Sequence, residues 1–99
     1  GAATAAAADP CEIMRAALLG GATSIVLAHV HPSGDPTPST QDKDVTRAIV
    51  QAGAAVRVAV LDHIIVASTP SGGLDYASMR ERGMWPVADA GVDTGTASK

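Results

Sequence analysis

The sequence predicts one small domain of the α/β class, in which a sheet is covered by flanking helices. Segments with apolar residues at helical spacing alternate with short β-branched runs, in the order helix, strand, helix, strand, strand. The 99 residues are enough for one domain. No apolar stretch approaches the roughly 20 residues of a membrane span. We expect an alanine-rich segment at 1–8, the domain at 9–86 and a disordered tail at 87–99.

The first predicted helix begins at Asp9-Pro10 and ends at Gly20-Gly21. Asp is a favoured N-cap, Pro is favoured at the first helical position, and Gly often follows a helix end. Between these signals lies an apolar stripe of Ile13, Met14, Ala17 and Leu18. Cys11 is the only cysteine and cannot form an internal disulfide. We expect it to be buried or half-buried, and its reduced state to suit a cytoplasmic protein.

The remaining elements follow from β-type runs and turn signals. Thr23–His29 is a predicted strand, and its continuous apolar run suggests that both faces are covered. Three prolines and a glycine make 31–38 a loop, and a second helix is predicted for Thr40–Ala54. Two β-type pieces then surround Asp62-His63, followed by a turn at 69–73, a short antiparallel strand at 74–76 and a helical turn at 78–82.

The histidine pair His29-Val30-His31 stands at the end of the first strand. Residues i and i+2 of a strand share one face, roughly 6.6 Å apart, so both imidazoles can converge on one ion. The carboxyl ends of strands are also where α/β sheets place their sites. The alternative is a pair of solvated histidines at a strand end.

Ser39 and Asp42 open the second helix, and two interpretations of them stay open. The loop after His31 can return this helix to the histidines, so that Asp42 completes a His, His, Asp set. Three protein ligands and one position for water are typical of catalytic zinc. Ser and an acid three residues later also resemble a capping box, which needs no metal. The two roles are compatible, because a helix N-terminus favours an anion.

The full pattern resembles a known family. His-x-His, seven residues, Ser, two residues and Asp form the JAMM signature, which His29, His31, Ser39 and Asp42 match. The stretches HVHPSGDPTPSTQDKDVTRAIVQAG and LDHIIV resemble the RadC branch of the JAB/MPN superfamily, and the resemblance runs from Pro10 to Trp85.

This resemblance implies a mixed α/β sheet of the cytidine-deaminase-like (JAB/MPN) type and one Zn²⁺. It implies that His29, His31 and Asp42 are the ligands and that Ser39 donates a hydrogen bond near the zinc water or the developing oxyanion. Relatives with the JAMM signature are metallopeptidases, some of which cleave isopeptide bonds, so a peptide or protein substrate is expected. The RadC name is historically linked to DNA repair.

Several positions depart from the family pattern or stay open. The family's general base is a glutamate on a strand before the first helix, whereas the only glutamates here are Glu12 and Glu81. We therefore expect a domain truncated at its N-terminus, whose open sheet edge offers a route to a homodimer. Val30 replaces the Asn that RadC proteins commonly carry. His63 is either a group that orients a ligand or the water, or a strand histidine bonded to a backbone carbonyl.

Three functions are thus in competition. The first is a zinc-dependent metallohydrolase that lacks its general-base glutamate in this chain. The second is a catalytically silent zinc-binding or interaction module. The third, a DNA-repair accessory domain, is disfavoured because the net charge is −3 and the seven cationic residues are scattered.

Overall fold

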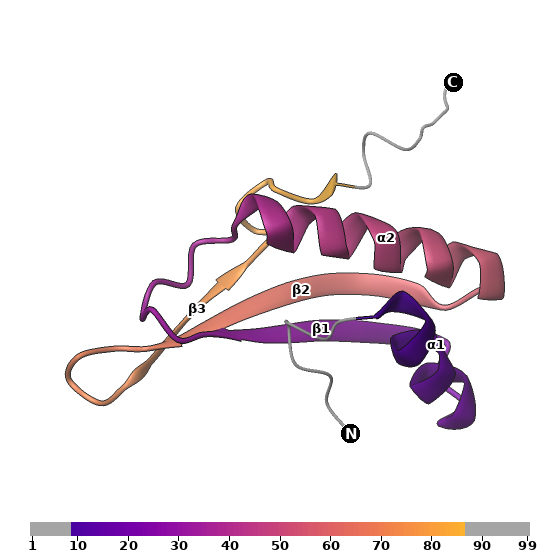
Figure 1. Cartoon of the computed structure of the whole chain (residues 1–99), viewed down its shortest axis with the longest axis horizontal. Coiled ribbons are helices and arrows are strands. Elements are labelled where there is room, and N and C mark those ends of the chain that lie inside the picture. The colour runs from indigo at the N-terminus through magenta and orange to yellow at the C-terminus, as the bar shows by residue number, and fades with distance from the viewer. Residues whose placement is uncertain (1–8, 87–99) are drawn as a thin grey trace.

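The computed structural model describes residues 9–86, and Figure 1 shows how their helices and strands are arranged. The elements are α1 (Pro10–Leu19), β1 (Ser24–His31), α2 (Thr40–Val56), β2 (Ala59–Ser68) and β3 (Leu74–Ser78). Their order is the predicted one. The expected N-terminal segment and tail, 1–8 and 87–99, lie outside the described residues.

The three strands form one mixed sheet in the order β1-β2-β3. β1 and β2 are parallel, and α2 connects them, while β2 and β3 are antiparallel neighbours. Figure 1 shows α2 running along the sheet and α1 near the C-terminal end of α2. The predicted α/β class with a mixed sheet is confirmed.

The main core lies where α1, α2 and the start of β2 meet, and its buried members are Met14, Ala17, Ile49, Val58 and Val60. α2 runs two residues beyond the predicted end and stops at Arg57, whose φ of 61° is left-handed. Gly53 lies inside the helix. A side chain would not fit at this position, because the backbone carbonyl of Val58 approaches it too closely. Within residues 9–86, no helix is both long and apolar enough to cross a membrane.

The two β-type pieces predicted around Asp62-His63 are joined in one continuous strand, β2. Its pairing with β1 shifts by one residue, so that Ile25 faces Val60 and Val26 faces Asp62. Leu61 is the extra residue of this bulge, which absorbs the irregularity without ending the strand.

Two burial predictions are wrong. β1 alternates between exposed and half-buried positions, so that only one of its faces is covered. Val30 is 65% exposed on the other face. Cys11 is exposed as well, because it lies outside the buried stripe of α1, which contains Met14 and Ala17.

Candidate metal site

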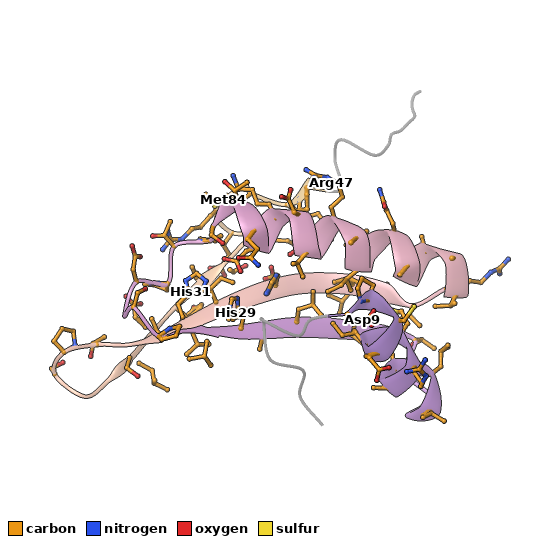
Figure 2. The ribbon with its side chains drawn as sticks, viewed as in Figure 1. Asp9, His29, His31, Arg47 and Met84 are labelled. Atoms are coloured by element: carbon orange, nitrogen blue, oxygen red, sulfur yellow. The ribbon has the colours of Figure 1, made fainter. Side chains whose placement is uncertain are left out.

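The site begins with the two histidines of β1. The strand extends to His31, so both residues belong to it and share the half-buried face with Ile25 and Leu27. Figure 2 shows both side chains on the side of the sheet that α2 covers. Their ring centroids lie 4.7 Å apart in an edge-on arrangement. The structure thus brings the pair together on one face, as strand alternation predicts.

Asp42, in the first turn of α2, meets both histidines. Its Oδ1 lies 2.8 Å from Nδ1 of His29, and its Oδ2 lies 3.0 Å from Nε2 of His31. Asp42 is only 3% exposed. The loop between β1 and α2 therefore returns the helix start to the strand end.

The capping box is present as well. The backbone N–H of Ser39 donates to Oδ2 of Asp42 at 2.7 Å, and the backbone N–H of Asp42 donates to Oγ of Ser39 at 3.0 Å. The Ser39 hydroxyl also donates to Oδ2, at 2.9 Å. Capping and contact with the histidines therefore coexist at one carboxylate. The predicted role of Ser39 as a hydrogen-bond donor near the zinc water or a developing oxyanion stays a prediction.

Asp42 is held in its anionic form. Burial by itself raises the pKa of this carboxyl, but hydrogen bonds from the Ser39 backbone, the Ser39 hydroxyl and His29 lower it, and the net pKa lies below the ordinary value. A buried anion surrounded by imidazoles is an environment that attracts a cation.

His31 faces an acceptor with each ring nitrogen. Nδ1 lies 2.9 Å from the backbone oxygen of Asp35, and Nε2 lies 3.0 Å from Asp42 Oδ2. A carbonyl and a carboxylate can only accept hydrogen bonds, so both contacts are favourable only if each nitrogen bears a proton or a metal cation. The N–H donated to the Asp35 carbonyl is the kind of contact that orients metal-bound histidines.

A group of three side chains around Asp42 could hold a metal ion. One ligand atom from each of His29, Asp42 and His63 can be chosen so that all three lie within 4.8 Å of one another. Ligand atoms around a tetrahedral zinc are separated by roughly 3.3 Å, from bonds of ~2.0–2.1 Å. This group contains two of the predicted ligands together with His63, and His31 adjoins the group through its contact with Asp42.

His63 lies on β2 beside Leu27 of β1 and is 4% exposed. Its ring stacks on that of His29 with centroids 6.3 Å apart, and burial lowers its pKa. The neutral ring is the form that binds metal. Of the two alternatives for His63, the backbone-carbonyl partner is not found at Nδ1, which lies 2.6 Å from Oγ1 of Thr46. Thr46, which follows Asp42 by one helical turn and so shares its face, was not among the predicted site residues.

The other acidic candidates do not join this group. Glu12 pairs with Arg15 on the exposed side of α1, and Glu81 is exposed in the turn after β3. Oδ1 of Asp35 accepts from the backbone N–H of Thr37 at 3.0 Å and from its hydroxyl at 2.7 Å, a pattern that is typical of turn residues.

Fold and site together define an α/β domain with a candidate metal site at the end of a parallel strand. The sequence model of the RadC-like JAB domain family matches residues 1–84. The chain belongs to this family. A UPF0758 protein of Symbiobacterium thermophilum is 47% identical over 81 residues, which cover 82% of this chain and 32% of the relative.

Two further relatives are similar to this chain over comparable lengths. A UPF0758 protein of Syntrophomonas wolfei is 40% identical over 75 residues, 76% of this chain and 30% of the relative. One from Listeria monocytogenes is 45% identical over 74 residues, 75% of this chain and 31% of the relative. The chain thus spans about a third of the length of the curated relatives it matches.

Proposed function

We propose that this chain forms the metal-binding part of a zinc-dependent hydrolase of the JAMM type, acting on peptide or isopeptide bonds. The observation that carries this proposal is the buried carboxylate of Asp42, with His29 on one oxygen and His31 on the other. Membership of the RadC-like JAB family supports it.

In this proposal Asp42 supplies the negative charge and His29 the first nitrogen, with either His31 or His63 as the third donor, so that one position stays open for water. Ser39 holds the carboxylate through two hydrogen bonds to Oδ2, so that its oxygens need not reorganise when a cation arrives. When bound, zinc would supply Lewis-acid activation of water and of the carbonyl under attack. A base for the attacking water would come from a glutamate elsewhere in the protein.

A catalytically silent zinc-binding module is the second candidate. It is favoured for the chain by itself, because Glu12 and Glu81 are both exposed and neither belongs to the histidine and aspartate group. In that case the ion would only tie the loop before α2 to the sheet.

Zinc titration against a chromophoric chelator tests the metal site. We expect one zinc per chain, and we expect Asp42→Asn to weaken binding by more than about 100-fold, beyond the usual effect of a supporting residue. His31→Ala should weaken it too. Asp44→Asn is the matched control, because Asp44 is exposed on the same helix. A chain without zinc affinity, or Asp42→Asn binding as tightly as wild type, would exclude the proposal.

Hydrolysis of a panel of peptide and isopeptide substrates, with and without a chelator, separates the two candidates. Cleavage that a chelator abolishes and zinc restores supports the hydrolase. Tight zinc binding without cleavage of any substrate in the panel supports the silent module for the isolated chain.

A further inference from the structure

Thr46 and His63 form a buried polar contact beneath the candidate metal site. Thr46 is 0% exposed. Its Oγ1 lies 2.6 Å from the backbone oxygen of Asp42, 2.6 Å from Nδ1 of His63 and 3.6 Å from Sδ of Met79. The hydroxyl thus joins the residue that provides the carboxylate to a ring that can provide a nitrogen.

One proton decides the direction of these hydrogen bonds. The Thr46 hydroxyl has a single hydrogen, and the carbonyl oxygen of Asp42 can only accept it. This bond to the residue four positions earlier is the usual one for a threonine inside a helix. If the hydrogen instead pointed at His63, two oxygens 2.6 Å apart would face each other with no proton between them. The consistent arrangement is Thr46 donating to Asp42 and Nδ1–H of His63 donating to Thr46.

We propose that Thr46 is a positioning residue that keeps the proton of His63 on Nδ1, so that Nε2 carries the lone pair and is the donor for a divalent cation. The consequence for metal affinity rests on the proposed function, whereas the position of the proton does not. A hydroxyl that is itself fixed to a backbone carbonyl plays the part that carboxylates and carbonyls play for other metal-bound histidines.

The ¹⁵N signals of the His63 ring in the metal-free chain test this directly. They are recorded with a chelator near pH 8, above the ordinary histidine pKa of about 6.5. We expect Nδ1 to be the protonated nitrogen in wild type and in Thr46→Ser. In Thr46→Val, which has a similar shape without the hydroxyl, protonation should shift toward Nε2. Zinc affinity should fall about 10–100-fold in Thr46→Val and recover in Thr46→Ser.

Wild-type spectra with the lone pair on Nδ1 would overturn the proposal, and so would Thr46→Val spectra that match wild type. If Thr46→Val does not fold, the wild-type and Thr46→Ser spectra still decide where the proton lies. A chain that binds no zinc, yet shows the Nδ1–H form lost in Thr46→Val, would contradict the proposed function and support the role of Thr46.

Discussion

The carboxylate of Asp42 contacts one histidine with each oxygen, and Oδ2 also accepts two hydrogen bonds from Ser39. A polar side chain this crowded and this deeply buried is costly to alter, because any partner that is removed leaves an unsatisfied group. Each substitution around Asp42 should therefore change stability and metal affinity together.

Ser39→Ala removes the N-cap of α2 and a donor to Asp42. We expect a loss of about 1 kcal/mol in the free energy of unfolding, as for other N-caps, and about tenfold weaker zinc binding. Urea denaturation with a chelator measures the first, and zinc titration measures the second. Ser39→Thr keeps the hydroxyl and should stay near wild type; equal losses in both variants would argue against the hydrogen-bonding role.

Asp62 gives the chain an acid-sensitive contact. It accepts from the hydroxyl of Ser78, from the backbone N–H of His63 at 2.7 Å and from that of Arg80 at 3.1 Å. Burial raises its pKa, but these hydrogen bonds lower it, and the net pKa is below the ordinary value. Its stabilising contribution is therefore complete above the unfolded pKa of about 3.9 and is lost as pH falls through the lower folded pKa.

We therefore expect wild type to lose more stability than Asp62→Asn between about pH 5 and pH 2. Urea midpoints measured with a chelator across this range provide the test. Parallel pH profiles for the two proteins would show that Asp62 is not the titrating group.

At the scale of elements, capping residues in the sequence correctly predicted where the helices begin, because a helix start depends on a few neighbouring residues. Asp9-Pro10 and Ser39 mark the two helix starts, and both act as expected: the side chains of Asp9 and Ser39 accept from the N-terminal turns of α1 and α2. The bulge at Leu61 and the exposed face of β1 were not predictable in this way. They depend on the register of two strands separated by a whole helix.

The candidate site likewise has one part that could be predicted from local sequence and one part that could not. The predicted site residues lie within one strand end, the loop after it and one helix start. Their spacing along the sequence was therefore enough to identify them. These residues are His29, His31, Ser39 and Asp42. The partnership of Thr46 with His63 requires β2 to pair so that His63 lies beside Leu27, and no short motif contains that information.

Gly53→Ala tests the packing of α2. In an ordinary helix interior this change stabilises by roughly 1 kcal/mol. Here the new methyl group would overlap the carbonyl oxygen of Val58, so we expect a net destabilisation of about 1–3 kcal/mol. Thermal or urea unfolding measures it. A more stable variant would show that the C-terminal turn of α2 shifts easily.

At the scale of the whole molecule, one face of the sheet is left uncovered by the helices and loops of residues 9–86. Val30, Val66 and Tyr76 are register partners across the three strands, and Val30 and Tyr76 are 65% and 59% exposed. This row lies opposite the face that carries the histidines. Exposed apolar rows of this kind promote association. The homodimer expected through an open sheet edge stays a prediction.

Val30→Asn should leave zinc affinity unchanged, because Val30 lies on the face of β1 opposite His29 and His31. Stability should change by less than about 1 kcal/mol. Sedimentation velocity at high concentration should show less self-association than wild type. Weaker zinc binding would mean that this position supports the loop after His31.

The proposed metal site requires that Asp42 at the start of α2 and two histidines of the sheet share one cation. A crystal of the chain soaked in zinc, with anomalous data collected at the zinc edge, tests this most directly. We predict a single anomalous peak within bonding distance of Asp42 and His29 and of one further nitrogen, from His31 or His63. Ordered side chains with no peak between them, or a peak only elsewhere on the surface, would contradict it.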